Sequence, residues 1–456
     1  MILRRLFTLS CNMNKNKDNR RTFNLAIPIF LQSVFQSFFS TADTYMVSQL
    51  SDQAVAAIGI ASRPLELLSK IFQMISLGIV IIIPRLLGNN DKKKADEISI
   101  YGIFLSMIIG LISSCFFCIF SYNILSVYNV ESNVLEKASI YLQIVGIGLV
   151  FQSLMIVLTA IVQSYERARS SMYISIFANI VNIGIDLYFI FIIQPGENIG
   201  IMCVACSTVF SQFLASFILL FFCNKQIRIR KKTHFTLENG IIILKAGFPA
   251  VGETFSYSAS QMVITLFISS LGTTVLSGYI YAMNIMLWLS RFPAALGKTS
   301  GIIVGALLGE KEYLQCRIYV LKNILINLVV TLICGCIVMI FSHKLLALFT
   351  SDVNILRIGF IVMFMEFIAL FGKSVNLIMG NVIRSTGNPQ IPAFVGIISM
   401  WILGVAGSYF LKRFFLLEIW GIEIAFVLDE VFRAGILTKY WLSNKWIDSK
   451  YLNLNR

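Results

Sequence analysis

Long apolar stretches, separated by short polar segments, follow one another along almost the whole chain of 456 residues. About 20 apolar residues in a helix cross the roughly 30 Å hydrocarbon core of a bilayer. The pattern predicts twelve spans, at approximately 22–49, 54–84, 98–121, 138–162, 172–193, 199–223, 241–271, 274–308, 319–342, 355–383, 391–411 and 418–442. The runs are continuous rather than alternating, which is typical of helices and not of barrel strands. The predicted fold class is an all-α membrane protein.

The chain also repeats itself, without a gap, at a shift of 221 positions. Pro28 falls on Pro249, and the segment 86–88 (Leu-Leu-Gly) falls on 307–309 (Leu-Leu-Gly). Six spans separate equivalent positions, so the halves are expected to be parallel repeats related by an axis along the membrane normal. We therefore predict two pseudo-symmetric six-helix bundles, an architecture that transporters use to open alternately to the two sides of a membrane.

The repeat and the charge pattern together predict the domain boundaries. They are an N-terminal tail 1–21, an N-lobe 22–223, a basic linker 224–238, a C-lobe 239–442 and a C-terminal tail 443–456.

Composition agrees with a membrane protein, since 57% of the residues are hydrophobic and only 13% are charged. The net charge of +14 is concentrated in alternate loops. These basic positions are Lys92 to Lys94, Arg167, Arg169, the stretch 225–232, Lys311 and Arg317. Because basic loops stay in the cytoplasm, we expect the protein to lie in a bacterial inner membrane with both termini on the cytoplasmic side. The basic runs are short and flanked by membrane spans, which argues against nucleic acid as a partner.

The residue types needed for a metal site or for catalysis are not grouped in this sequence, so an enzyme is not expected. Nine cysteines are present, and two pairs of them have CxxC spacing (Cys115 with Cys118, Cys203 with Cys206). Both pairs lie inside apolar spans, so the cysteines are interpreted as packing residues rather than metal ligands or disulfides. The chain has only two histidines and lacks a serine elbow, a Walker loop and a glycine-rich dinucleotide turn. No cofactor is predicted, and an ion gradient is the expected energy source.

Ionisable residues inside the spans are the strongest functional signal, because a charge at the bilayer centre is costly and normally marks a pathway. They are Asp43, Arg63, Glu66, Lys70 and Asp186 in the first half and Glu253, Arg291, Lys298, Glu366, Lys373, Glu423, Asp429 and Glu430 in the second. Asn182 lies one helical turn before Asp186, on the same face. Asp43 and Asp186, if they share a dry pocket, cannot both ionise cheaply, so we expect the pKa of one of them to rise toward the working pH range. The oxygens of Asp43, Asn182 and Asp186 could alternatively ligate Na⁺.

Four segments resemble the multidrug and toxic compound extrusion (MATE) family, and the likeness covers nearly the whole chain. They are 42–47 (ADTYMV), 179–186 (NIVNIGID), 249–253 (PAVGE) and 383–387 (IRSTG). The resemblance implies two six-helix lobes arranged as a V, a monomer, and antiport of a solute against H⁺ or Na⁺. It also implies that Asp43 is the coupling residue, joined by Asn182, Asp186 and Thr208.

The chain departs from the family pattern at two places. Lys373 stands where one multidrug branch has an acid, eleven residues before Arg384 of the IRSTG segment, and Gln163 begins QSYE where the family usually has Arg-x-x-Gly. Counted from the cytoplasmic helix ends, Glu253 and Lys373 lie at matching depth. We therefore hypothesise that Glu253 pairs with Lys373; the alternative is that Lys373 faces the cavity unpaired.

The repeat places Lys70 on Arg291 and Glu253 on Gln32, and with Lys373 these residues are the predicted substrate cavity. Glu66 and Arg63 share the face of Lys70, which predicts partial neutralisation there, whereas Arg291 has no acid at the matching positions. A cavity with Arg291, Lys298 and Lys373 would favour anionic or zwitterionic solutes.

The sequence thus predicts a secondary active exporter of an organic solute, a drug or a metabolite, in exchange for H⁺ or Na⁺, with small molecules and membrane lipids as its partners. The alternative is a flippase for an anionic or lipid-linked saccharide. A channel is disfavoured because no filter loop is found. Since Asp43, Asn182 and Asp186 have no counterparts at the 221-residue shift, ion coupling is assigned to the N-lobe and substrate choice to the C-lobe.

Overall fold

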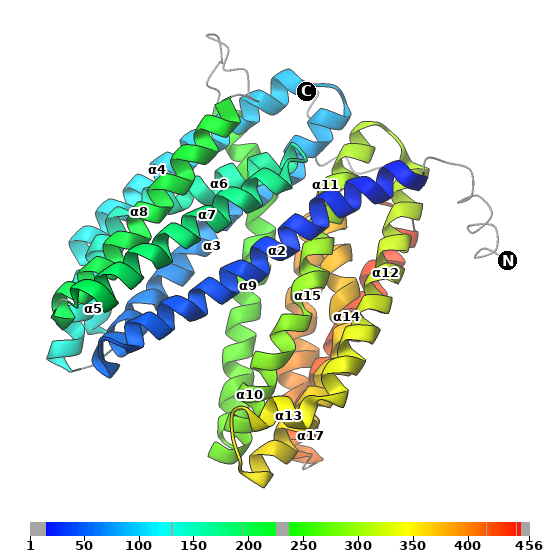
Figure 1. The fold of residues 1–456 in the computed structure, drawn as a ribbon. Helices are drawn as coiled ribbons and strands as arrows, with labels where there is room; N and C mark the ends of the chain where they lie inside the picture. Colours follow the sequence, from blue (N-terminus) through cyan, green and yellow to red (C-terminus); the bar gives the residue numbers. More distant parts are fainter. Residues whose placement is uncertain are drawn as a thin grey trace. The chain divides into compact units, whose positions relative to one another are not determined.

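The computed structural model describes residues 15–128, 131–194, 196–224, 237–415, 417–443 and 445–447. Within those ranges every regular element is a helix, which confirms the predicted fold class (Figure 1). The first half contains α2 (Lys15–Ser48), α3 (Asp52–Gly88), α4 (Lys92–Ser126), α5 (Ser132–Ile147), α6 (Leu149–Ser164), α7 (Ala168–Leu187), the π-helix η1 (Tyr188–Ile193) and α8 (Glu197–Asn224). The second half contains α9 (Leu237–Ser269), α10 (Thr273–Leu289), α11 (Arg291–Gly309), α12 (Tyr313–Ile340), α13 (Ser342–Ala347), α14 (Val353–Ser385), α15 (Gln390–Ser399), the π-helix η2 (Met400–Ala406), α16 (Gly407–Phe414) and α17 (Glu418–Leu442).

Nine of the described helical segments are long and apolar enough to cross a membrane, and α5 with α6, bent by 50°, makes a tenth. The predicted spans at 241–271 and 418–442 correspond to α9 and α17, which are helical throughout but less apolar. Together with these two, the helices account for all twelve predicted segments.

Two predicted spans differ from the structure in their limits. The span 274–308 is divided at Ser290 into α10 and α11, because Pro293 has no N–H to bond to the carbonyl of Leu289. Helix α2 begins at Lys15, so residues 15–21 of the predicted tail are helical, while residues 1–14 lie outside the described residues.

The chain packs as two compact units. We call the described residues from Leu31 to Phe248 the N-unit, and those up to Phe30 and from Pro249 onwards the C-unit. Most of the predicted linker, residues 225–236, lies outside the described residues.

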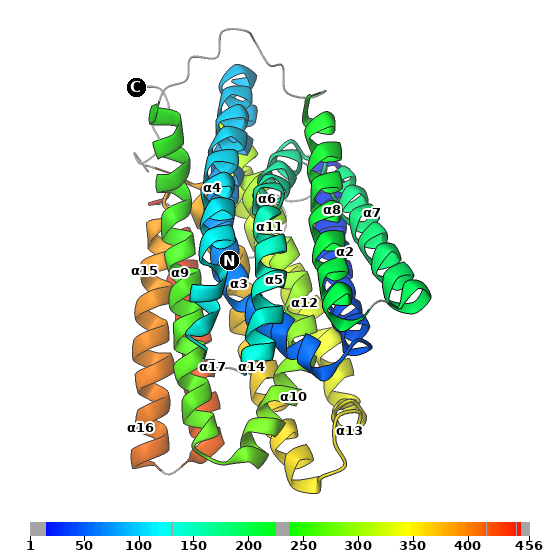
Figure 2. The same ribbon diagram turned by 90° about the vertical axis from the view of Figure 1, so that its left-hand side faces the viewer.

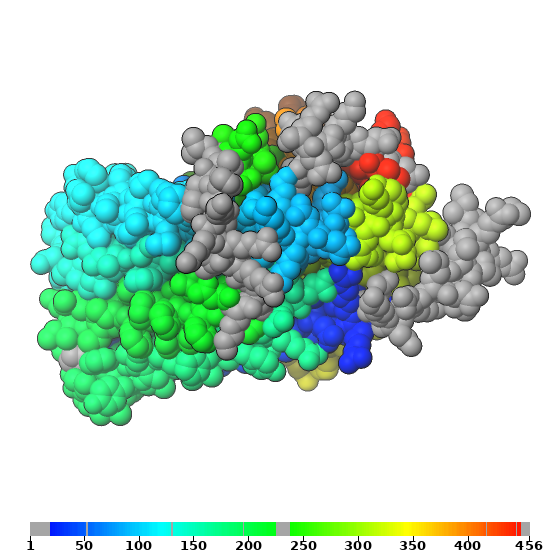
Figure 3. Space-filling model, turned by 90° about the horizontal axis from the view of Figure 1, so that it is seen from above, coloured from blue at the N-terminus to red at the C-terminus, as the bar shows by residue number. Residues whose placement is uncertain are grey.

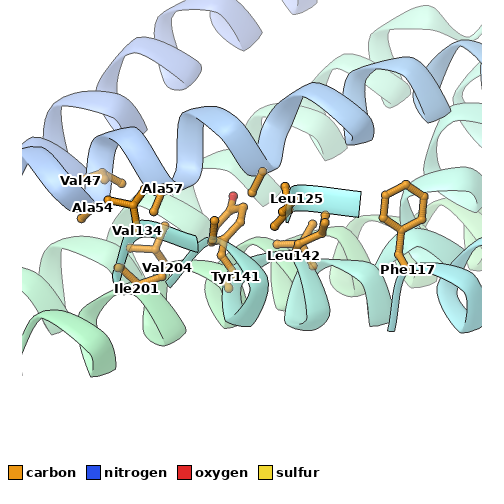
Figure 4. Packing of buried hydrophobic residues seen from close by; sticks show 14 of the residues in the cluster. Val47, Ala54, Ala57, Phe117, Leu125, Val134, Tyr141, Leu142, Ile201 and Val204 are labelled. Atoms are coloured by element: carbon orange, nitrogen blue, oxygen red, sulfur yellow. The ribbon is translucent and has the colours of Figure 1, made fainter. Parts of the chain in front are cut away.

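The core of the N-unit is formed mainly by apolar side chains of α2, α3, α4, α5 and α8 (Figure 4). Ala54, Ala57 and Ala61, at 0% exposure, lie along one side of α3. Such small side chains let membrane helices approach closely. This close packing holds the polar side chains of α5, α7 and α8 in fixed positions.

In the C-unit, α14 is the central helix and packs against α17, α11, α10 and α12. Gly372 of α14 lies against the backbone of Glu430 in α17, where a side chain would not fit. Figure 2 shows α16 alongside α9, and the ammonium group of Lys412 in α16 donates to the carbonyl of Phe267 in α9 at 3.0 Å. Many charged side chains of this unit are on α14 and α17.

The boundary between the units falls at the two prolines that the repeat relates. The first turns of α2 belong to the C-unit, where Thr22 shares a hydrogen bond of 3.0 Å with Tyr319 of α12. In the space-filling view, the blue start of α2 lies beside the yellow-green start of α12 (Figure 3). The first turns of α9 belong to the N-unit, where Ile243 packs on Gly78 of α3. Pro28 and Pro249 remove a backbone hydrogen bond at each boundary, so these are natural bending points.

Candidate functional site

The N-unit brings together polar side chains from three helices. Asp43 comes from α2, Asn182 and Asp186 from α7, and Ser207 from α8. Asn182 and Asp186 are one turn apart and therefore point to the same side of α7. Asn182, Asp186 and Ser207 are buried and Asp43 is half-buried. The predicted grouping of Asp43 with Asn182 and Asp186 is therefore present in space.

The two carboxyl groups are linked through Ser207 and Asn182. The Ser207 hydroxyl is hydrogen-bonded to Oδ1 of Asp186 and lies 3.1 Å from the Asn182 amide oxygen. The orientation of this amide, assigned from its neighbours, lets its nitrogen donate to Oδ1 of Asp43 at 3.2 Å. We call this connected set, Asp43, Asn182, Ser207 and Asp186, the carboxyl chain.

Thr208 joins the carboxyl chain through its backbone rather than its side chain. Its N–H donates to the Asn182 amide oxygen at 3.3 Å, whereas its hydroxyl donates to the carbonyl of Val204 at 2.9 Å. The predicted position is therefore at the site, but the contact of Thr208 with Asn182 does not require a threonine side chain.

Tyr141 of α5 closes the site on the core side. Its ring is buried in the row of side chains that also holds Ala57 and Val204 (Figure 4). Its hydroxyl interacts with the Thr208 side chain and with the charges of Asp43 and Asp186. Neither Tyr141 nor Ser207 was predicted as a site residue from the sequence, although each is a polar residue inside a predicted span.

The carboxyl chain has the chemistry of a cation-responsive site. Two ionised carboxyl groups in a largely dry setting carry a desolvation cost of several kcal/mol each. A bound proton removes one of those charges. The amide presents its N–H₂ to Asp43, which leaves the amide oxygen turned away from Asp43.

An open pocket of about 430 Å³ follows the same helix as Asp43. It is lined by the polar side chains of Ser40, Thr41, Thr44, Tyr45 and Ser48. The hydroxyls of Thr41, Thr44 and Ser48 donate to carbonyls of their own helix. The pocket lining thus carries hydroxyl groups and no charged side chain, but most of its surface is apolar.

The hypothesis that Glu253 pairs with Lys373 is wrong. The Glu253 carboxylate binds the guanidinium of Arg384 at 2.5 Å, between α9 and α14. The planar guanidinium of Arg384 presents a fork of N–H donors that suits a carboxylate. Arg384 lies near the C-terminal end of α14, so counting residues from the helix ends placed it too far from Glu253 to be a partner. Gly396 of α15 leaves room for the Glu253 carboxylate, which a side chain there would contact.

Lys373 lies instead among buried acids of the C-unit. It interacts electrostatically with Glu366 on its own helix, Glu430 on α17 and Tyr257 on α9. Lys373 makes no ion pair within 4.0 Å among the described residues, which agrees with the alternative prediction that it is unpaired. Its surroundings are acidic, however, and do not resemble an anion-binding cavity.

Arg433, which the sequence analysis overlooked, neutralises part of this acidic region. Its guanidinium binds Asp429 at 3.1 Å and Glu430 at 2.5 Å, all on α17. The spacing of i, i+3 and i+4 on one helix is a signal that would have predicted these pairs.

The remaining predicted cavity residues are distributed over both units. Gln32 accepts a hydrogen bond from Gln163 at 3.1 Å in the N-unit. Glu66 interacts at 3.9 Å with Arg63, and the expected neutralisation of Lys70 by Glu66 is not seen as an ion pair. In the C-unit, the buried Nε of Arg291 has no hydrogen-bond partner among the described residues. Lys70 and Arg291 therefore remain without an ion-pair partner in the described part of the chain.

Sequence comparison matches both halves of the chain to one family. The model of the MatE family matches residues 28–188 and 249–410. The "Uncharacterized transporter YisQ" of Bacillus subtilis (strain 168) is 30% identical over 430 residues, which cover 93% of this chain and 94% of that protein. The "Probable multidrug resistance protein NorM" of Thermotoga maritima is 23% identical over 440 residues, or 94% of this chain and 93% of that protein.

Solved structures share the fold. A structure described as "Crystal structure of MATE in complex with MaD3S" has a TM-score of 0.86 at 18% identity and covers 93% of this chain and 96% of its own. A second, described as "Reverse polarity of binding pocket suggests different function of a MOP superfamily transporter from Pyrococcus furiosus", has a TM-score of 0.85 at 17% identity, covering 93% of this chain and 95% of its own.

Proposed function

The chain belongs to the MatE family of membrane transporters, and on this premise we propose that it is a secondary active exporter that moves an organic solute out of the cell in exchange for protons. As a family member it is a multi-pass membrane transporter and not an enzyme. The observation that carries the proposal is the carboxyl chain, in which Asn182 and Ser207 connect Asp43 to Asp186.

Protonation of this chain supplies the coupling. A proton on Asp43 or Asp186 removes a charge from the buried site and turns one acceptor into a donor, which changes the hydrogen bonds that hold α2 against α7 and α8. An ion that binds one conformation better than the other shifts the equilibrium between them. Loading and release of the proton on opposite sides of the membrane would then drive alternating access.

The solute is proposed to be a drug-like or metabolic organic molecule with polar groups. The α2 pocket, whose mostly apolar lining carries hydroxyl groups and no charged side chain, supports binding of such a molecule. We further propose that the protein works as a monomer in the plasma membrane with both termini in the cytoplasm, and that it needs no cofactor besides the coupling ion.

A flippase for an anionic or lipid-linked saccharide is the second candidate function. The observation that favours it is the presence of Lys70 and Arg291 without ion-pair partners among the described residues. Uptake of a cationic dye, ethidium, that is unchanged in Arg291→Gln would support the exporter. Preferential movement of a fluorescent anionic lipid, lost in Arg291→Gln, would support the flippase.

Proteoliposomes with an imposed gradient test the exporter directly. Dye uptake should follow a pH gradient and ignore a Na⁺ gradient, and Asp43→Asn should abolish it. Glu131→Gln, at an exposed position before α5, is the matched control and should transport like the wild type. Uptake driven by Na⁺ alone, or uptake that survives Asp43→Asn unchanged, would contradict the proposed coupling.

A further inference from the structure

Two carboxyl groups of the C-unit are buried outside the site described above. Glu423 of α17 is 2% exposed and Glu366 of α14 is 4% exposed. Neither side chain has a hydrogen-bond or ion-pair partner among the described residues. The two carboxyl groups interact electrostatically, and the helices that carry them, α14 and α17, are packed together.

The ionisable groups around this pair come from four helices. They are Tyr257 of α9, Tyr279 of α10, Lys373 of α14, and Glu430 and Arg433 of α17. Tyr279 lies in the field of both carboxyl groups, and Lys373 and Glu430 act on Glu366. Arg433 is already occupied by Asp429 and Glu430.

The charges in this region do not balance if all of them are ionised. Four acids, Glu366, Glu423, Asp429 and Glu430, face two bases, Lys373 and Arg433. Lys373 lies beside Glu366 and offsets its charge, whereas the interaction partner of Glu423 is another carboxyl group. A buried carboxylate without a counter-charge is costly enough to become neutral by taking up a proton.

We infer that Glu423 is a second proton-binding site of this transporter, in the C-unit, and that it exchanges its proton during the transport cycle. The exchange rests on the proposed antiport function, whereas the protonated state does not. A proton fits because it needs one carboxyl oxygen. A metal ion would need more ligands, and no cluster of three or more acidic, histidine or cysteine residues able to hold one occurs among the described residues.

The repeat shows that this site belongs to the C-unit alone. Shifted back by 221 positions, Glu423 falls on Met202 and Glu366 falls on Val145. The carboxyl chain of the N-unit likewise has no counterpart in the C-unit, since Asp43 falls on Ile264 and Asp186 on Gly407. Each half of the duplicated scaffold thus carries its own pair of acids, on different helices. The proposed C-unit site would add to the ion coupling that the sequence predicts for the N-lobe.

Infrared spectroscopy of purified protein tests the protonated state without any transport substrate. Protein labelled with ¹³C-glutamate shifts the carbonyl band of a neutral glutamic acid and leaves the aspartic acid bands in place, which separates Glu423 from Asp43 and Asp186. We expect one such glutamate band at neutral pH in the wild type. It should be lost in Glu423→Gln and kept in Glu418→Gln, an exposed control in the first turn of α17.

Glu423→Asp guards against a variant that simply misfolds. It should fold and transfer the neutral carboxyl band to a position that the glutamate label no longer shifts. Absence of a labelled band in the wild type, or its survival in Glu423→Gln, would overturn the site.

The proton exchange is tested by measuring how many protons are exchanged for each solute molecule. In proteoliposomes with ethidium as the solute, this ratio follows from the membrane voltage at which a given ethidium gradient produces no net transport. Glu423→Gln should lower the ratio by one proton, while Glu418→Gln leaves it unchanged. An unaltered ratio in Glu423→Gln would overturn the exchange. If the wild type shows no proton-driven uptake at all, the antiport proposal fails while the infrared result still decides the protonation of Glu423.

Discussion

Glu253 and Arg384 form an ion pair of 2.5 Å in the C-unit at the positions that Gln32 and Gln163 occupy in the N-unit after the 221-residue shift. In the N-unit the two amides share a hydrogen bond of 3.1 Å. The duplicated scaffold therefore keeps one contact between the first and fourth membrane segments of each half. It is made by opposite charges in one half and by neutral groups in the other.

This equivalence predicts how the ion pair responds to substitution. Replacing either Glu253 or Arg384 alone with Gln leaves a largely buried charge without its partner, which we expect to lower stability by about 3 kcal/mol. The double variant Glu253→Gln with Arg384→Gln copies the amide pair of the N-unit and should recover most of the loss. Thermal unfolding of the purified variants in detergent measures both effects.

The exposed pair of Arg63 and Glu66 is the control, since its side chains are 70% and 66% exposed and 3.9 Å apart. Glu66→Gln should change stability by less than about 1 kcal/mol. If the double Gln variant is no more stable than the less stable of its two single variants, the contact in the C-unit requires charge. The proposed equivalence of the two contacts would then be wrong.

Ser207, rather than the Thr208 side chain, is expected to control ion coupling in the N-unit. Ser207→Ala cuts the link between Asp186 and Asn182, and a lost hydrogen bond to a charged group is worth about 1.5–3 kcal/mol. We expect the proton concentration for half-maximal transport to change by about 10- to 100-fold. Thr208→Val keeps the backbone N–H that reaches Asn182 and should have a much smaller effect.

Ser211→Ala serves as the matched control on the same helix, because that hydroxyl donates only to the carbonyl of Thr208. It should leave proton dependence unchanged. If Thr208→Val changes the proton concentration for half-maximal transport as much as Ser207→Ala does, the contact needed for coupling is the one between the Thr208 hydroxyl and Tyr141 instead.

The helices and the alignment of Asn182 with Asp186 could be predicted from the sequence, because length, hydropathy and a one-turn spacing are local properties. The role of Asp43 beside them was implied by the resemblance to the MATE family. The sequence did not predict Ser207, whose role depends on how α8 rotates against α7. The mistaken pairing of Glu253 shows a second limit. Depth along a helix is readable from residue counts, but the length and direction of the Arg384 side chain decide which partner is reached. The acidic region around Glu423 was visible only as separate residues, since its packing joins helices far apart in the chain.

Arg433 is expected to be among the most important single charges for stability of the C-unit. Arg433→Met keeps the length of the side chain but leaves Asp429 and Glu430 without their counter-charge, a change worth about 3–5 kcal/mol when a buried pair is broken. The loss relative to the wild type should shrink as the pH is lowered, because protonation removes the unpaired negative charges. Melting temperatures measured across a pH series check both the size and the sign.

Arg413→Met, at an exposed position at the end of α16, is the control and should leave the melting temperature nearly unchanged. A loss in Arg433→Met that does not depend on pH would indicate that the guanidinium acts through packing rather than charge.

The close approach of α14 to α17 at Gly372 is expected to be a requirement for the acidic region. A methyl group there would lie 2.8 Å from the backbone carbon of Glu430, so Gly372→Ala forces the two helices apart and should destabilise the protein by about 1–3 kcal/mol. Gly435→Ala, also in a helix but with nothing within 4 Å of the added carbon, should be neutral or stabilising by up to about 1 kcal/mol. Thermal unfolding distinguishes the two. Because Glu366 and Glu423 interact electrostatically and are carried by these same two helices, Gly372→Ala should also weaken the neutral glutamate band, whereas Gly435→Ala should preserve it. Equal behaviour of the two variants would mean that the helices can separate here without cost, and that the burial of Glu423 does not depend on their contact.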